Sequence, residues 1–111
     1  MEINATMQNG ICVLDLTGRM DATTVSSFEE ACKAELEKGN LKIIVNMKNL
    51  EYISSAGLRG ILIMEKTSKA MKASIVFCHL QSMVSEVFKI SGFNSILQVV
   101  ASFDEAVNIL K

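Results

Sequence analysis

The sequence predicts an α/β domain with helices packed on a mixed β-sheet, and three observations support this fold class. Asn9-Gly10 separates two β-prone runs, which is a strong hairpin signal because both central residues of a type I′ turn need a positive φ. Residues 43–45, Ile-Ile-Val, show no alternation, as is typical of a strand buried on both faces. Strand and helix patterns then alternate to the end of the chain, as in sheets with right-handed crossovers.

The hairpin strands are expected at residues 3–7 and 11–16, and a helix is expected to begin near Asp21. An aspartate can accept a hydrogen bond from the first free amides of a helix, so we expect Asp21 to be its cap. The apolar residues that follow recur at helical spacing and predict a buried stripe of Val25, Phe28, Cys32 and Leu36. Four charged residues off that stripe should face water, namely Glu29, Glu30, Lys33 and Glu37. Gly39 can end the helix in a left-handed conformation.

Beyond the central strand, we expect a helix at residues 55–71, a strand at 74–78 and a helix at 82–91 that Gly92 ends. A short strand is expected at 97–100. Ser102, with Glu105 three residues later, has the pattern of a capping box and predicts a last helix, which makes about four helices. No linker or repeat is visible, and 111 residues suit one core, so residues 1–111 are predicted to form a single domain.

Composition and charge exclude several classes of function. Lys and Arg number 11 against 12 Asp and Glu, and they are scattered, so direct nucleic-acid binding is not expected. The longest apolar runs are about four residues, against about 20 needed to cross a bilayer, so we expect no membrane insertion. The N-terminus lacks the charged-then-apolar pattern of an export signal, which favours a cytoplasmic protein.

The residues that commonly hold metals and cofactors are isolated in this sequence. Cys12, Cys32 and Cys78 are odd in number, far apart and set in apolar surroundings, which predicts reduced, buried thiols. His79 is the one histidine and has no ligand-like neighbour. Neither Gly-x-Gly-x-x-Gly nor a P-loop motif occurs, so no metal or cofactor is expected.

Two enzymatic or phosphorelay alternatives fit the residues poorly. Ser54 or Ser55 could be a nucleophile, but there is no Gly-x-Ser-x-Gly elbow and His79 is the one available base, so we predict that the chain is not an enzyme. A response-regulator receiver needs acidic residues at its strand ends. Asn46 and Asn49 occupy that region here.

Residues 51–60 join the buried strand to the second helix, at the strand end where functional groups of α/β sheets collect. Ser54 or Ser55 is expected to cap the helix. A helical wheel predicts a sheet-facing side of Gly57, Gly60, Ile61, Met64, Ser68 and Met71. The opposite, charged side contains Arg59, Glu65, Lys66 and Lys69. Two leucines lie on that charged side, which predicts an exposed patch of Ser55, Leu58, Arg59 and Leu62.

The run Tyr52-Ile53-Ser54-Ser55-Ala56-Gly57-Leu58 resembles the signature of the anti-sigma factor antagonists, the single-domain STAS proteins. That signature is Asp-Ser-(Ser, Thr or Ala)-Gly-(Leu, Ile or Val) at a strand-to-helix loop. The resemblance extends over the strand at residues 42–46 and the turn at residues 18–21, and it covers essentially the whole chain. It implies a mixed sheet flanked by helices.

The resemblance also implies a partner-switching function. The unmodified protein would bind an anti-sigma factor that is a serine kinase, phosphorylation of the signature serine would release it, and a metal-dependent serine phosphatase would reverse the modification. Matched residue by residue, the phosphoacceptor is Ser55, with Ser54 as second choice. The implied partner-binding residues are Asp21, Ser54, Ser55, Gly57, Leu58, Arg59 and Leu62.

Two departures from the signature leave an alternative open. Ser54 replaces the usual Asp, which removes a charge beside the acceptor, and Ala56 replaces a frequent second hydroxyl residue. Asn46 also stands where relatives often have an acid. Similar STAS proteins serve as accessory subunits of lipid-transport ABC systems or as scaffolds without a phosphorylation cycle, and this role is the alternative function.

Overall fold

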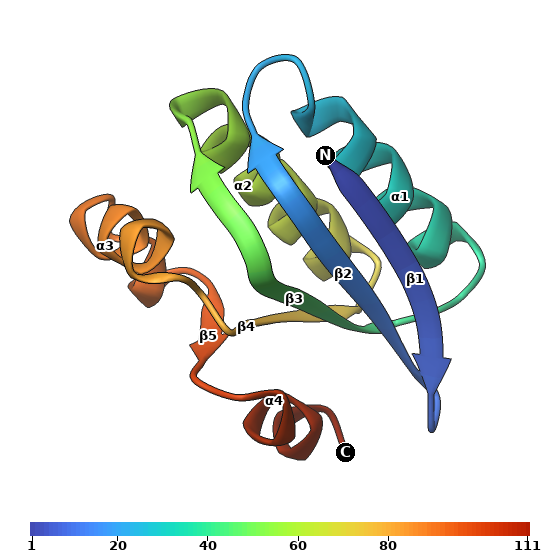
Figure 1. Cartoon of the computed structure of the whole chain (residues 1–111). Coiled ribbons are helices and arrows are strands. Elements are labelled where there is room, and N and C mark those ends of the chain that lie inside the picture. Colours follow the sequence, from blue (N-terminus) through green and yellow to red (C-terminus); the bar gives the residue numbers. More distant parts are fainter.

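A five-stranded sheet forms the centre of the computed structural model, which describes residues 1–111 (Figure 1). The strands lie in chain order, and β1 is antiparallel to β2 whereas all other neighbours are parallel. They are β1 (Glu2–Gln8), β2 (Ile11–Met20), β3 (Lys42–Ile53), β4 (Ser74–Cys78) and β5 (Gln98–Val100). The predicted mixed sheet with an opening hairpin is therefore confirmed.

Four α-helices cover the two faces of this sheet unequally. They are α1 (Val25–Glu37), α2 (Ser55–Ala70), α3 (Ser82–Ile90) and α4 (Phe103–Leu110), and a 3₁₀ turn at Phe93–Ser95 follows α3. The first three pack their buried residues into a core of 20 residues, and α4 closes a smaller core of 7 on the opposite face. Figure 1 shows α2 behind β2 and β3, and α4 near the C-terminus, away from α1 and α2.

Local sequence signals place several element ends correctly, but β2 and β3 run on to Met20 and Ile53, beyond the predicted ends at residues 16 and 46. Asn9 (φ 53°) and Gly10 (φ 82°) form the turn between β1 and β2, with Gln8 opposite Ile11. Ser102 Oγ accepts a hydrogen bond from the Glu105 amide at 3.2 Å and begins α4. The predicted bounds of β4 and the predicted starts of α2 and α3 are confirmed.

The prediction that Asp21 caps the first helix is wrong, because α1 begins four residues later at Val25. The Asp21 carboxylate accepts hydrogen bonds from the amide and hydroxyl of Thr23, at 2.9 and 2.7 Å. Its carbonyl oxygen accepts from the Val25 amide at 2.9 Å. Asp21 therefore stabilises a tight turn that precedes the helix.

Two further corrections concern α2. Glu65, expected in solvent, is 5% exposed, with Oε2 at 3.5 Å from Lys69 Nζ. Met71, expected against the sheet, is 38% exposed because it lies beyond the last helical turn, where the chain leaves the sheet face. The buried side of α2 therefore includes the charged Glu65 and does not include Met71.

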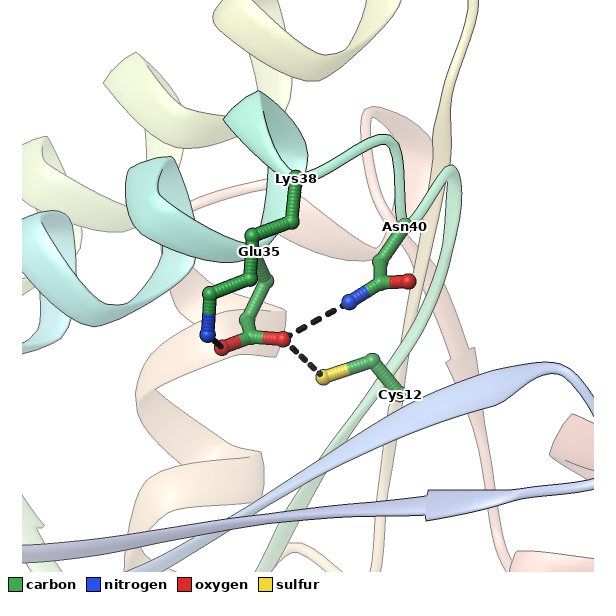
Figure 2. A network of polar contacts seen from close by, with 4 residues as sticks. All are labelled: Cys12, Glu35, Lys38 and Asn40. Atoms are coloured by element: carbon green, nitrogen blue, oxygen red, sulfur yellow. Dashed lines mark hydrogen bonds and ion pairs between the residues drawn. The ribbon is translucent and has the colours of Figure 1, made fainter.

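The buried Glu35 anchors the C-terminal end of α1 to the sheet (Figure 2). Its Oε1 accepts hydrogen bonds from Asn40 Nδ2 at 2.8 Å and from Cys12 Sγ at 3.4 Å, and its Oε2 lies 3.1 Å from Lys38 Nζ. Burial alone would raise the pKa of Glu35, but the hydrogen bonds from Lys38, Asn40 and Cys12 together lower it. The carboxylate therefore holds α1, the following turn and β2 together.

All three cysteines are buried free thiols, as predicted. Burial raises the pKa of Cys12 and of Cys32 to about 12, and that of Cys78 to about 11. These thiols therefore stay protonated and are part of the core.

Two glycines let α2 approach its neighbours closely. Gly57 faces the sheet, as the wheel predicted, whereas Gly60 faces α1 instead. A Cβ on Gly57 would lie 2.9 Å from the carbonyl oxygen of Met20 and 2.8 Å from Ile53 Cγ1. A Cβ on Gly60 would overlap the Val25 side chain of α1. The position of α2 therefore depends on the lack of a side chain at both residues.

We predict that Gly60→Ala lowers the free energy of unfolding by about 1–3 kcal/mol, because the added methyl group overpacks the contact between α2 and α1. Urea denaturation measures the loss. In a Val25→Ala background, which removes the overlapping side chain, Gly60→Ala should cost less stability than it does in wild type. A loss of equal size in both backgrounds would contradict the overlap.

We predict that Glu35→Gln lowers stability by about 1 kcal/mol at pH 7, because the charge-assisted hydrogen bonds are weakened. The pKa of Glu35 is lower in the folded chain, so its ionisation stabilises the fold above the ordinary carboxyl pKa, and this contribution is lost as the pH falls through the folded-state pKa. Urea denaturation at pH 7 and pH 3 should therefore show a smaller pH dependence for the variant. Glu37→Gln, on the exposed side of α1, is the control and should match wild type.

Candidate functional site

The carboxyl ends of β2 and β3 bring two loops side by side. The strands are parallel neighbours with Met20 opposite Ile53, and the Ser54 amide donates a 2.9 Å hydrogen bond to the Met20 carbonyl. The turn that begins at Asp21 therefore lies next to the start of α2, at the end of the sheet where the two arrowheads lie together in Figure 1. Asp21, one of the partner-binding residues that the resemblance implied, thus lies on the loop beside the signature serines.

The two adjacent serines have different environments. Ser54 is extended (φ −96°, ψ 175°), and its Oγ accepts a hydrogen bond from the Gly57 amide at 3.2 Å. Its carbonyl oxygen accepts from the Leu58 amide at 2.9 Å, so Ser54 is the cap of α2. Ser55, the first residue of the helix, is exposed, and its hydroxyl makes no hydrogen bond within the chain. The choice of cap that the sequence left open is therefore Ser54.

The exposed patch predicted on α2 is smaller than expected. Ser55 and Arg59 are exposed, but Leu58 and Leu62 are half-buried, and Leu58 packs against the main core. Gly57 is buried under the helix start, where it can contact no partner directly. The accessible surface therefore consists of two polar residues with part of each leucine, and Gly57 serves packing.

Asp21 supplies a negative charge next to this patch. Hydrogen bonds from the Thr23 hydroxyl and amide lower the pKa of its carboxyl, so it is ionised at neutral pH. The signature acid that Ser54 replaces would have lain at the same strand ends. A carboxylate is thus retained at this end of the sheet, on the neighbouring loop.

The sequence analysis missed Arg19 and Tyr52, which lie beside the site. The Arg19 guanidinium carbon is 4.2 Å from the centre of the Tyr52 ring, in the geometry of a cation–π contact. The residues are register partners on β2 and β3, after a register shift between Gly18 and Arg19. No sequence signal predicted this pairing, because it depends on that irregularity.

The structure holds His79 away from both serines. His79 Nε2 accepts a hydrogen bond from the Phe103 amide at 3.3 Å, so the ring contacts the start of α4. The open cavity of about 280 Å³ between α1 and α2 contains neither a histidine nor Ser54 or Ser55. No three His, Cys, Asp or Glu side chains gather to hold a metal, and no helix is long and apolar enough to span a membrane.

The structure is a small α/β domain whose central strand leads into a helix that one serine caps and an exposed serine begins. The model of the STAS domain family matches residues 2–106. The chain therefore belongs to the STAS domain family, as the resemblance implied.

Comparisons with individual proteins agree with this assignment. The candidate anti-sigma factor antagonist BtrV of Bordetella bronchiseptica is 32% identical over 100% of this chain and 96% of its own length. A Thermotoga maritima structure of the same description matches with a TM-score of 0.90 at 17% identity, over 97% of this chain and 93% of that one.

Bacillus SpoIIAA has a similar fold in two states. Its phosphorylated form matches with a TM-score of 0.73 at 20% identity, over 99% of this chain and 100% of that one. The unphosphorylated form gives 0.72 at 18% identity, over 96% of each chain. By family and relatives, the chain is of the anti-sigma factor antagonist type.

We predict different effects on stability for the two serines. Ser54→Ala should lower the free energy of unfolding by about 1 kcal/mol because the cap of α2 is lost. Ser55→Ala should change it by less than about 0.5 kcal/mol because the side chain is exposed and makes no hydrogen bond. Urea denaturation of both variants measures the difference, and equal losses would contradict the assignment of the cap.

Proposed function

We propose that this protein is an anti-sigma factor antagonist that works by partner switching. It binds an anti-sigma factor serine kinase while Ser55 is unmodified, phosphorylation of Ser55 releases it, and a serine phosphatase restores binding. Residues 1–111 act as a single STAS domain in the cytoplasm, without catalysis or a cofactor. The observation that carries the proposal is the contrast between the two serine hydroxyls. That of Ser54 caps α2, whereas that of Ser55 is exposed and makes no hydrogen bond.

Exposure favours Ser55 over Ser54 as the phosphoacceptor. A kinase must bring the acceptor oxygen in line with the γ-phosphate, so the hydroxyl must be able to enter the kinase active site. Modification of Ser54 would break its hydrogen bond to the Gly57 amide and remove the helix cap. Modification of Ser55 costs no bond within the chain.

The fold should tolerate a phosphate on Ser55. The group adds about −1.5 to −2 charges at the amino end of α2, where free amides and the helix macrodipole favour an anion. Arg59, one turn further along the helix, is exposed and in no ion pair, so it can approach the phosphate. The likeness of the chain to both forms of SpoIIAA supports a switch that works without refolding.

A docked partner would not tolerate the same charge. The proposed binding surface consists of Asp21, Ser54, Ser55, Leu58, Arg59 and Leu62, with Gly57 beneath it. In an interface the phosphate must be desolvated beside the ionised Asp21, and an unpaired buried charge costs several kcal/mol. Because each 1.4 kcal/mol is about tenfold in affinity, a cost of about 3 kcal/mol weakens binding more than a hundredfold.

We predict that Ser55→Asp weakens binding to the kinase partner at least about tenfold, whereas Ser55→Ala binds as wild type does. The partner is first captured from the native cell with the Ser55→Ala variant as bait, and isothermal titration then gives each affinity. Ser85→Asp, which places the same charge on an exposed serine of α3, is the matched control and should leave affinity unchanged.

Two results would argue against the proposal. Equal affinities for wild type and Ser55→Asp would exclude charge at this residue as the switch. Mass spectrometry that finds no phosphate on Ser55 under any growth condition would favour the accessory-subunit function without a phosphorylation cycle.

A further inference from the structure

The outer strand β1 carries no feature that prevents it from pairing with another chain. It forms the long edge of the sheet, and its pairing with β2 runs without interruption from Glu2–Thr17 to Gln8–Ile11. Exposed edges are usually protected by Lys, Pro, bulges or short length. The segment Glu-Ile-Asn-Ala-Thr-Met-Gln has no Lys, Pro or bulge, and its one charge, Glu2, lies at the first residue, whereas the opposite edge, β5, is only 3 residues long.

The side chains of β1 beyond Ile3, which packs against the main core, are also left uncovered. Ala5 and Met7 pair with the buried Leu14 and Cys12, so they face the same side as the main core, yet both are exposed and Met7 is 52% exposed. Helix α1 packs its buried residues over the main core and leaves the outer part of β1 open. A second chain added at this edge would cover both side chains.

Helix α1 leaves space for such a neighbour. Its Val25 and Glu29 lie against Gly60 of α2, so the opposite side of α1 faces the β1 edge. That side consists of the small residues Ser27, Ala31 and Ala34, spaced three to four apart, while Glu30, Lys33 and Glu37 lie elsewhere on the helix. Lys38 continues this side at the end of the helix, where its Nζ lies 3.1 Å from Glu35 Oε2. A second sheet edge would therefore meet small side chains along most of α1 and one lysine at its end.

We propose that two copies of this chain pair through their β1 strands, antiparallel and with a two-fold axis at Ala5, to form a continuous ten-stranded sheet. The register places Ile3 opposite Met7 of the other copy, Asn4 opposite Thr6, and Glu2 opposite Gln8. One face of the new pair is then apolar and the other polar. No like charges lie opposite each other, so the strand is complementary to itself.

The turn geometry selects this register. A two-residue loop closes on a hydrogen-bonded pair, so Gln8, Thr6, Asn4 and Glu2 direct their backbone groups to β2. The backbone groups of Ile3, Ala5 and Met7 then point away from the sheet. A two-fold axis at Ala5 gives all three of these residues a partner within β1. An axis at any other residue from Ile3 to Met7 leaves at least one of them opposite a residue outside the strand.

The dimer would present two copies of the Ser55 surface, one in each half of the sheet. The paired strands contribute a small interface, so the association should be reversible in the range of about 10 µM to 1 mM. A partner that is itself a dimer would gain affinity by binding both copies. The pairing itself does not require the proposed phosphorylation switch.

Sedimentation velocity from 10 µM to 1 mM tests the proposal. Wild type should shift from monomer to dimer, and Ala5→Lys and Ala5→Glu should each remain monomeric because like charges meet at the axis. An equimolar mixture of the two variants should dimerise again. Ala70→Lys, an exposed change on α2, is the control and should behave as wild type. Circular dichroism confirms that each variant folds.

Cysteine cross-linking tests the register. Under a mild oxidant such as diamide, Ala5→Cys should form an intermolecular disulfide rapidly, because hydrogen-bonded partners lie about 5.5 Å apart between Cα atoms. Thr6→Cys is the matched control: with the axis at Ala5 the two copies of residue 6 are offset along the strands by about 7 Å, too far for a disulfide. The three native thiols are buried and should not react. A monomeric wild type at 1 mM, a dimer that survives both charge variants, or faster cross-linking at residue 6 would overturn the proposal.

Discussion

The hydrogen bond from the Ser54 amide to the Met20 carbonyl is the contact on which the arrangement of the site depends. It extends the parallel pairing of β2 and β3 by one residue beyond Met20 and Ile53. The two strands end side by side. β2 continues into the turn at Asp21, and β3 continues into α2. Residues that are 33 or more positions apart in sequence thus share one small surface, and their side chains need no direct bond to each other.

The rest of the core keeps that surface in place. Because glycine has no side chain, Gly57 lets α2 lie close to the end of β2, and Gly60 lets it lie close to α1. Glu35 joins the far end of α1 to β2. Both ends of α1 are therefore tied down, one by close packing and one by a buried carboxylate. Ser55 itself has no such support, which suits a residue whose chemistry changes while its scaffold does not.

Features encoded by neighbouring residues could be predicted from the sequence, and features created by tertiary packing could not. The Asn9-Gly10 turn, the Ser102 cap and the bounds of β4 follow from local conformational preference and hydrophobic pattern. The start of α1 was missed because Asp21 fits a helix cap and a tight turn equally well from sequence alone.

The site shows the same division. The exposure of Ser55 and Arg59 follows from the helical wheel, but the wheel does not show how far neighbouring elements reach around α2, so the burial of Glu65 and the partial cover of Leu58 and Leu62 were missed. The contact between Arg19 and Tyr52 requires a register shift that no residue pattern specifies.

The place of α4 has a practical consequence for attaching other molecules to this protein. The helix lies on the sheet face opposite α1 and α2, its first turn is held by Ser102 and His79, and Lys111 at its end is exposed. A fluorophore, affinity handle or biosensor surface joined after Lys111 would leave the Ser55 end accessible. The first residue offers no such freedom, because Met1 packs against the main core and precedes the edge strand directly.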